Sequence, residues 1–349
     1  MKKAVKKRIV TGAIIATIVA AIGLAVYYFR RKSTKVSTVA TAKAAAVVKV
    51  PKEPFSAEIT GSFDSFLNSH LADYGEALMV YVSKGNQEYT FKKEGNNFDE
   101  AYGIASMGKY LTAAAIMTLV DEGKLDLDKP LSHYLPWIKD VYEYNTFTVR
   151  QILAHRTTIV ADSLFDNTQT LDLDGAIRAI ANAHPFDPLL ARPYQYSSTS
   201  YKFAARVAEV VSGQKWEVLF KQRIGDKCGM PNTFFSRFTD NPDVGKGAQS
   251  SLNDMARFME MIRNNGEYNG TRVLKASSVS EMETLQLGSP EYGLGCWVFP
   301  QVNEVAAQGA FGARAWVNRH NNTYCVIMTI QNNSAFVSED FKALVRSTL

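Results

Sequence analysis

The sequence predicts an α/β fold of the α+β kind. One antiparallel sheet is built from both ends of the chain and flanked by helices, and a helical subdomain is inserted between its strands. Residues 77–83 and 87–91 form two strand-like runs separated by Lys84-Gly85-Asn86, which is a turn signal. Residues 106–282 are mainly helical in pattern, and strand-like runs return after residue 293. Strands at both ends with helices between them indicate a single sheet with an inserted helical part.

The helix and strand boundaries follow from hydrophobic periodicity and from start and stop signals. Helices are expected at residues 57–74, 106–122, 148–154, 200–212, 252–264 and 338–346. The C-terminal strands are expected at residues 293–299, 304–307, 313–319 and 323–331. A cleft between the sheet and the helical part is the expected place for a site.

The N-terminal region predicts a membrane anchor. A basic tail, residues 1–8, precedes 21 uncharged residues, 9–29, and Arg30-Arg31-Lys32 follows them. This length is enough to cross a bilayer core as a helix, and Tyr27 and Tyr28 lie where interfacial aromatics are favoured. A cleaved signal peptide is the alternative, although its apolar region is usually shorter and ends in small residues. Residues 30–55 are expected to be a linker, and residues 56–349 the folded domain.

Charge is distributed unevenly along the chain. Residues 1–52 hold twelve of the 39 Lys and Arg residues and none of the 34 acidic ones, so the remainder carries 27 basic and 34 acidic residues, a net of −7. The folded part therefore gives no electrostatic reason to expect nucleic acid as a partner. The slight excess of basic residues before the apolar run favours a single-pass protein with its folded part outside the cytoplasm and membrane lipid around its N-terminal helix.

Cysteine and histidine spacing does not suggest a metal site. The three cysteines cannot form a complete disulfide set, and Cys296 and Cys325 lie in strand-like apolar runs where small buried side chains are expected. The five histidines are scattered, so no zinc site is expected.

The most informative motif is Ser106-Met107-Gly108-Lys109 at the start of a predicted helix. Residues three apart lie on one helical face, so Lys109 can reach the Ser106 hydroxyl. Serine is a weak nucleophile until a base takes its proton, and lysine can be that base if burial or nearby cations lower its pKa. The helix N-terminus also favours developing negative charge.

Two further segments could complete a serine hydrolase site. Residues 193–198 form a polar, aromatic loop, and its Tyr196 could handle a proton. Residues 307–313 contain Gly309 between two predicted strands, where a backbone can come close to a ligand and present an N–H to an oxyanion. Each segment alone is also consistent with an ordinary loop or turn.

Taken together and in this order, the motifs resemble the penicillin-recognising serine hydrolases of the class C β-lactamase type. That group includes D-alanyl-D-alanine peptidases, D-aminopeptidases and β-lactamase-fold esterases. The resemblance covers about residues 57–348. It rests on the segments 103–109, 119–128, 148–155, 196–198, 269–274 and 292–297.

The resemblance implies a role for each matching residue. Ser106 would attack the acyl carbon, Lys109 and Tyr196 would share the proton transfers, and the N–H groups of Ser106 and Ala310 would form the oxyanion hole. An acyl-enzyme would form and be hydrolysed by water without a metal or cofactor. Residues around the substrate would be Ser198, Gln308, Gly309 and Arg314.

The chain also departs from the family pattern. Ala307-Gln308-Gly309 stands where the family usually has Lys or His before x-Gly, so a cation that binds substrate carboxylates is missing. Arg314 could replace it if its strand position turns it toward the site. Ser198 replaces the usual Asn and is a shorter hydrogen-bonding group. His155 begins a loop without the usual glycine, and a structural role is expected for it.

The leading hypothesis is therefore a membrane-anchored serine hydrolase that acts on a small ester, amide or peptide. Two alternatives remain open. The altered third motif could mark a catalytically inactive binding or scaffold protein, and Arg314 could restore a true β-lactamase or DD-peptidase.

Overall fold

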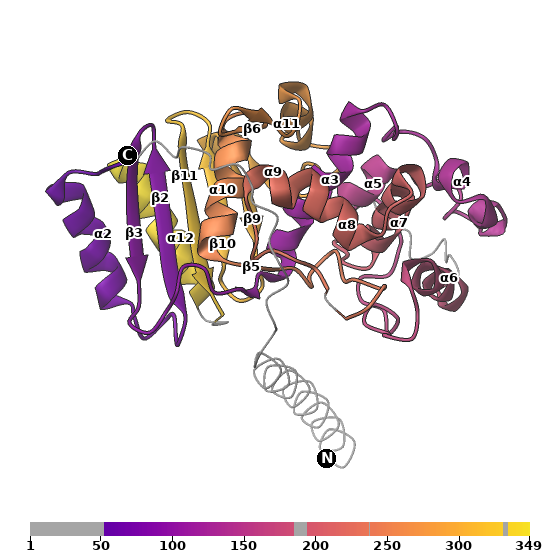
Figure 1. Cartoon of the computed structure of the whole chain (residues 1–349), viewed down its shortest axis with the longest axis horizontal. Coiled ribbons are helices and arrows are strands. Elements are labelled where there is room, and N and C mark those ends of the chain that lie inside the picture. The colour runs from indigo at the N-terminus through magenta and orange to yellow at the C-terminus, as the bar shows by residue number, and fades with distance from the viewer. Residues whose placement is uncertain (1–51, 185–193, 237, 331–333) are drawn as a thin grey trace, which may run out of the picture. The chain divides into compact units, whose positions relative to one another are not determined.

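A computed structural model of the whole chain describes residues 52–184, 194–236, 238–330 and 334–349 (Figure 1). The predicted membrane span at residues 9–29 lies outside these ranges, as do the basic tail and most of the linker. Within the described ranges, no helix combines the length and the apolar character needed to cross a membrane.

A seven-stranded sheet in the order β1-β3-β2-β11-β10-β9-β8 forms the centre of the fold. Its strands are β1 (Glu53–Pro54), β2 (Leu78–Lys84), β3 (Gln87–Lys92), β8 (Trp297–Phe299), β9 (Glu304–Gln308), β10 (Arg314–Asn318) and β11 (Thr323–Thr329). N-terminal β2 pairs with C-terminal β11, so the sheet is built from both chain ends, as the sequence predicts (Figure 1).

The prediction of a wholly antiparallel sheet is wrong at one edge. The pairings from β3 to β8 are antiparallel, but β1 pairs with β3 in parallel and makes the sheet mixed. Strand β1 comes from the end of the predicted linker, and Phe55 beside it is buried. The last linker residues thus belong to the folded unit.

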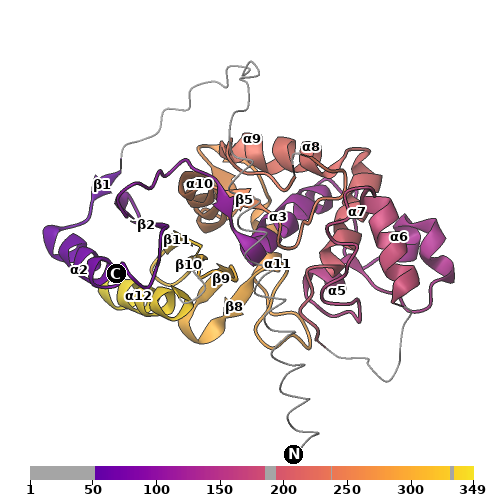
Figure 2. The ribbon, with the colours of Figure 1, turned by 90° about the horizontal axis from the view of Figure 1, so that it is seen from below.

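Both faces of the sheet are covered, and alternate side chains of each strand contact different helices. In β2, Val80 packs toward α2 (Ala57–Ser69) and α12 (Ser334–Thr348), whereas Tyr81 faces the larger core on the opposite side. Helix α10 (Leu252–Arg263) covers that second face (Figure 2). Strands buried on both faces are apolar along almost their whole length, which is why β2 lacks a polar alternation.

The inserted part consists mainly of helices, seen on the right of Figure 1. They are α3 (Gly108–Asp121), α4 (Leu131–Tyr134), α5 (Val149–Leu153), α6 (Leu173–Ala183), α7 (Ser200–Ser212), α8 (Trp216–Phe220) and α9 (Asp226–Cys228), with α11 (Ala276–Met282) following α10. Short helical turns occur at η1 (Ala105–Met107), η2 (Pro136–Asp140), η4 (Lys221–Gly225) and η5 (Pro300–Val302). Helix α3 is buried on nearly every side because it lies between the sheet and α7.

Two small ladders complete the fold, and one of them positions the predicted nucleophile. Strand β4 (Tyr102–Gly103) pairs with β5 (Gln249–Ser250), and β6 (Glu267–Tyr268) pairs with β7 (Thr271–Arg272). The β4–β5 ladder ends three residues before Ser106, so it fixes where the chain enters the nucleophile turn.

Strand β8 is shorter than the predicted strand at 293–299, because the backbone at Gly295 packs against helix α3. Gly295 adopts φ +85°, and a Cβ there would lie 2.7 Å from the Lys109 carbonyl oxygen. This backbone crosses α3 instead of extending the sheet. The three cysteines are free and buried, which confirms the expectation of small apolar side chains for Cys296 and Cys325.

Candidate active site

Ser106 lies on a tight turn at the start of α3. The preceding residue, Ala105, has φ +47°, a left-handed conformation that is unfavourable for a residue with a Cβ. Non-glycine residues held in this region are often found at functional sites, because the surrounding structure must impose the conformation. The Ile104 N–H donates to the Ala248 carbonyl at 3.0 Å and ties the turn to the segment before β5. The helix begins at η1, as the sequence predicts.

Lys109 is completely buried and makes three hydrogen bonds with its ammonium nitrogen. Nζ lies 3.0 Å from Ser106 Oγ, 2.9 Å from Ser198 Oγ and 2.9 Å from the Gly245 carbonyl oxygen. The predicted contact between Ser106 and Lys109 is therefore present. Burial lowers the pKa of Lys109 to about 7, and the nearby Asp243 carboxylate partly opposes this effect.

The three partners of Lys109 allow a productive arrangement of its protons when it is neutral. A neutral amine has two hydrogens to donate and one lone pair. The Gly245 carbonyl can only accept, so it takes one hydrogen, and Ser198 Oγ can accept the other. The lone pair then points to Ser106, the third neighbour and a hydroxyl that can donate. The site can thus hold an amine ready to accept the serine proton.

Tyr196 is in contact with both members of this pair. The side chains of Ser106 and Tyr292 are near its hydroxyl and both act to lower its pKa, and Lys109 Nζ lies 4.6 Å from its ring centroid. The ring also stacks on Trp297, with centroids 5.8 Å apart. Burial raises the pKa of Tyr196, so the hydroxyl is protonated at neutral pH. Tyr196 is therefore suited to donate a proton, and Lys109 is the better base.

Ser198 reaches Lys109 although its side chain is shorter than that of Asn. The approach depends on Gly245, where a Cβ would lie 2.5 Å from the Ser198 carbonyl oxygen. Backbone contact between these two residues brings the Ser198 hydroxyl and the Gly245 carbonyl to the same amine. The short Ser198 side chain can reach Lys109 because residue 245 is a glycine and lets the two backbones come close.

Gly309 brings the end of β9 against the nucleophile turn. A Cβ on Gly309 would lie 2.7 Å from the Ile104 carbonyl oxygen, so only glycine fits without movement. Gln308 is the last residue of β9 and is half-buried. Among the described residues, no backbone carbonyl outside the helices and strands accepts a hydrogen bond from the N–H of Ser106 or of Ala310. Both N–H groups are free to bind a substrate oxygen.

Arg314 is occupied by other partners. Its Nε lies 3.0 Å from Glu339 Oε1, and one Nη donates to the carbonyl oxygens of Gly309 and Ala313. The residue is almost fully buried in β10. Arg314 therefore supports the turn that carries Gly309. Its positive charge is already paired with the Glu339 carboxylate.

His155 lies below Tyr196 in an aromatic cluster. Its Nδ1 accepts the N–H of Ser197 at 3.1 Å, and its ring centroid lies 4.2 Å from that of Tyr196. Burial lowers the pKa of His155 well below its usual range, and the charge of Lys109 acts in the same direction. A neutral His155 holds the loop of Tyr196 in place, in keeping with the structural role expected for it.

Comparison with known proteins identifies the family of the chain. The Beta-lactamase family model matches residues 67–347, which is most of the chain. The chain belongs to the β-lactamase family. Among curated relatives, the teichoic acid D-alanine hydrolase of Staphylococcus aureus is 20% identical over 313 residues, covering 81% of this chain and 77% of the relative. These relatives are hydrolases, and the chain is a hydrolase of the serine β-lactamase-related type.

Solved structures share the fold. A β-lactamase-like protein from Bacteroides dorei is 23% identical with a TM-score of 0.72, covering 82% of this chain and 98% of that one. A D-stereospecific amidohydrolase from Streptomyces is 20% identical with a TM-score of 0.61, covering 80% and 97%. At these identities the likeness shows the β-lactamase fold alone.

Several residues of this β-lactamase-family site could not be singled out from the sequence. Gly245 contributes a backbone carbonyl, which leaves no side-chain signal. Tyr292 and Trp297 lie in a glycine-containing run that gives no sign of which residues face Tyr196. Asp243, two residues before Gly245, carries a recognisable turn signal, because Asp often hydrogen-bonds the backbone two residues on. Within the described part of the chain, no group of three His, Cys, Asp or Glu side chains could hold a metal ion.

Proposed function

We propose that the protein is a serine hydrolase that forms an acyl-enzyme on Ser106 and then hydrolyses it. The observation that supports this most is the fully buried Lys109 amine, 3.0 Å from Ser106 Oγ, with a pKa lowered to about 7 by burial. A base with its pKa near neutral pH is best matched to general-base catalysis.

Acylation begins when Lys109 Nζ takes the Ser106 proton as Oγ attacks the acyl carbon. The carbonyl oxygen becomes an oxyanion, which the N–H groups of Ser106 and Ala310 bind. The bond to the leaving group then breaks. The leaving oxygen or nitrogen takes a proton from the Tyr196 hydroxyl, and the Lys109 ammonium, whose Nζ lies 4.6 Å from the centroid of the Tyr196 ring, then returns a proton to the tyrosine oxygen.

Deacylation uses the same groups in the reverse direction. Water attacks the acyl carbon and gives its proton to the neutral Lys109 amine. The ester bond to Ser106 breaks, Ser106 regains its proton, and the acid product leaves. Because Lys109 is neutral at the start of each half-reaction, both halves need the same protonation state.

The preferred substrate is a small ester or amide whose recognition does not need a carboxylate. Ala307-Gln308-Gly309 brings no cation, and Arg314 is paired with Glu339. A D-alanyl ester or amide is the first candidate, since relatives carry the names teichoic acid D-alanine hydrolase and D-stereospecific amidohydrolase. A true β-lactamase or DD-peptidase would need Arg314 to leave Glu339.

The inactive scaffold alternative is less well supported. An inactive site has no physical reason to keep an amine buried with a lowered pKa, since burying an ionisable group is unfavourable for stability. The contacts of Lys109 with Ser106, Ser198 and Gly245 are all retained.

We also propose that residues 9–29 anchor the protein in a membrane, with residues 56–349 outside the cytoplasm. The support is the length of the apolar run and its basic flanks. Membrane fractionation of the full chain and of a chain lacking residues 1–29 tests it. The full chain should sediment with membranes, and equal partition of both chains would contradict an anchor.

A serine-reactive fluorophosphonate tests the assignment of the nucleophile. The wild type should be labelled on Ser106, and Ser106→Ala should lose both labelling and turnover of p-nitrophenyl esters. Labelling that survives the substitution would exclude Ser106. Turnover of D-alanyl esters alongside D-alanyl-D-alanine peptides separates the substrate classes, and faster cleavage of the peptides would contradict the preference proposed here.

A further inference from the structure

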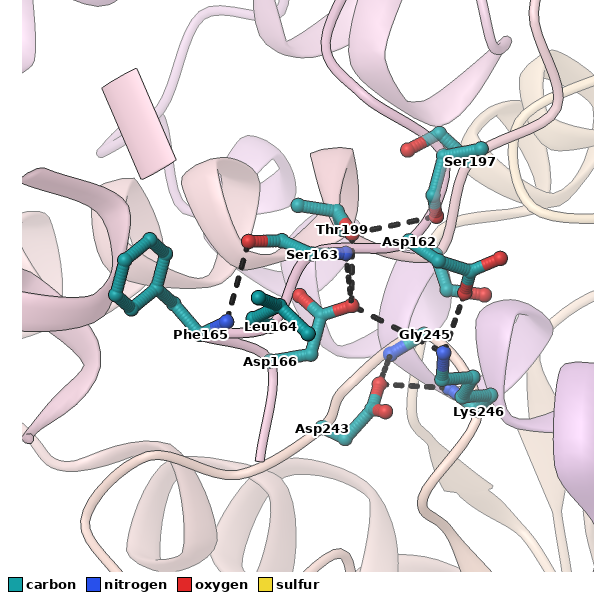
Figure 3. Close-up of polar contacts among 12 residues, drawn as sticks. Asp162, Ser163, Leu164, Phe165, Asp166, Ser197, Thr199, Asp243, Gly245 and Lys246 are labelled. Carbon is teal, nitrogen blue, oxygen red and sulfur yellow. Dashed lines mark hydrogen bonds and ion pairs between the residues drawn. The ribbon is translucent and has the colours of Figure 1, made fainter. Parts of the chain in front are cut away.

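The segment 243–247 forms a tight turn next to the Lys109 amine. The Asp243 carboxylate is buried, and its Oδ1 accepts the N–H groups of Gly245 at 3.2 Å and Lys246 at 3.1 Å (Figure 3). The Gly247 N–H donates to the Asp243 carbonyl at 2.7 Å. Asp243 thus accepts all three of these hydrogen bonds, two with its side chain and one with its backbone carbonyl.

This turn sets the position of the Gly245 carbonyl. A Cβ on Gly247 would lie 2.8 Å from the Asp243 carbonyl oxygen, and one on Gly245 would contact the backbone of Ser198. The turn is therefore packed against Ser198 on one side and closed by Asp243 on the other. Its Gly245 carbonyl accepts from Lys109 Nζ at 2.9 Å. A shift of the turn would move this acceptor and so redirect the amine.

Charged groups face the turn from every element around it. Lys202 on α7, whose Nζ donates to Asn241 Oδ1 at 2.7 Å and to the Pro242 carbonyl at 2.9 Å, is a neighbouring cation. Lys246 in the turn also acts on the Asp243 carboxylate and pairs with Asp162 at 2.5 Å.

The loop that follows Asp162 brings one more carboxylate. Asp166 acts on Asp243 as a like charge, and it accepts a hydrogen bond from Thr199 (Figure 3). Around Lys109 itself, the charged and titratable groups are Asp243, Lys246, Asp162 and His155, together with Tyr196 and Tyr201, whose ring centroids lie 4.6 Å and 5.7 Å from Nζ. Among the charges acting on Lys109, Asp243 has the largest effect and raises the pKa of the amine.

We propose that Asp243 is a positioning residue for Lys109, because its carboxylate holds the Gly245 carbonyl against the amine and places a negative charge beside that turn. The inference rests on the proposed role of Lys109 as the base. Asp243 contributes in two ways that can be separated. Its hydrogen bonds to the turn need only an acceptor oxygen, whereas its electrostatic effect on Lys109 needs the negative charge.

Two substitutions separate the contributions. Asp243→Asn keeps an Oδ1 acceptor for the Gly245 and Lys246 N–H groups but removes the charge. The midpoint of the pH–rate profile for Ser106 acylation should then fall by roughly one pH unit, with the plateau rate near that of the wild type. Asp243→Ala removes the acceptor as well, so its plateau rate should fall by about ten- to a hundredfold, as expected for a displaced catalytic group.

The measurement is the rate of covalent adduct formation on Ser106 with p-nitrophenyl acetate across pH, in the full chain, with circular dichroism as a check of folding. Asp240→Asn is the matched control, because Asp240 is an exposed acid three residues before Asp243. Its Oδ2 lies 3.5 Å from Lys215 Nζ. Its profile should match the wild type. The same midpoint in Asp243→Asn and wild type would overturn the electrostatic role, and an unchanged plateau in a folded Asp243→Ala would overturn the positioning role. Absence of any adduct in the wild type would instead refute the proposed function.

Discussion

Replacing Lys109 with methionine should abolish activity and stabilise the fold at neutral pH. Methionine is unbranched, neutral and flexible enough to fill the space of the lysine chain. Burial moves the pKa of Lys109 from 10.5 to about 7. At about 1.36 kcal/mol per pH unit, this difference opposes folding by up to roughly 5 kcal/mol when the amine is charged in the unfolded chain. The substitution also removes three hydrogen bonds worth roughly 1 kcal/mol each, so a net gain of about 1–2 kcal/mol is expected.

The sign of the pH dependence makes this prediction specific. Between about pH 7 and pH 10.5 the unfolded chain holds a proton on Lys109 that the native protein lacks, so wild-type stability rises with pH through this window. Below about pH 7 the amine is charged in both states and the full penalty remains. The methionine variant lacks this titration. It should be the more stable protein near neutral pH and the less stable one above about pH 10, where the lost hydrogen bonds dominate.

Urea unfolding at about pH 7 and about pH 10 measures the difference, with fluorophosphonate labelling as the readout of activity. A variant that is destabilised equally at both pH values would show that Lys109 is not held with a lowered pKa. Retained labelling in the variant would show that Ser106 does not need this base.

Three further predictions follow from the packing of the site. Gly245→Ala should slow Ser106 labelling and destabilise the fold by roughly 1–3 kcal/mol in urea unfolding, because its Cβ would lie 2.5 Å from the Ser198 carbonyl oxygen. Gly61→Ala is its control: no atom lies within 4 Å of that Cβ, so stability should be unchanged or higher. Tyr196→Phe should keep the stacking on Trp297 but slow turnover. Mass spectrometry measures how much acyl-enzyme is present at steady state. Full turnover in this variant would exclude the Tyr196 hydroxyl from proton transfer. Arg314→Gln should lower the melting temperature, because Glu339 and the Gly309 turn lose their partner. The KM for a neutral ester should stay the same. A KM raised only for anionic substrates would instead place Arg314 in substrate binding.

Much of the architecture could be predicted because it depends on local patterns. Helix α7 was expected at residues 200–212 and is found there, since its apolar spacing and Gly213, which has φ +68°, mark its face and its end. The pairing of the chain ends also followed, because apolar strands at both ends of a chain with helices between them have few other partners. The parallel strand β1 could not be foreseen, because a two-residue pairing of Glu53 and Pro54 carries no periodic signal.

The candidate site was predictable where side chains carry the chemistry and not where the backbone does. The Ser106–Lys109 spacing gives a helical face, so their contact was expected and is present. The sequence could not indicate the Gly245 carbonyl, because every residue has a backbone carbonyl. Its position beside Lys109 depends on a turn that is distant from Lys109 in sequence. The pairing of Arg314 with Glu339 was missed because strand alternation does not say which carboxylate from α12 lies opposite.

The pH dependence of Ser106 acylation tests the central claim most directly. Stopped-flow measurement of the p-nitrophenol burst, with the adduct on Ser106 confirmed by mass spectrometry, gives the rate of the first chemical step. If neutral Lys109 is the base, the rate rises with pH to a plateau, with a midpoint near its pKa of about 7. A rate that keeps rising in proportion to hydroxide through about pH 9, or the absence of a Ser106 adduct, would contradict the account.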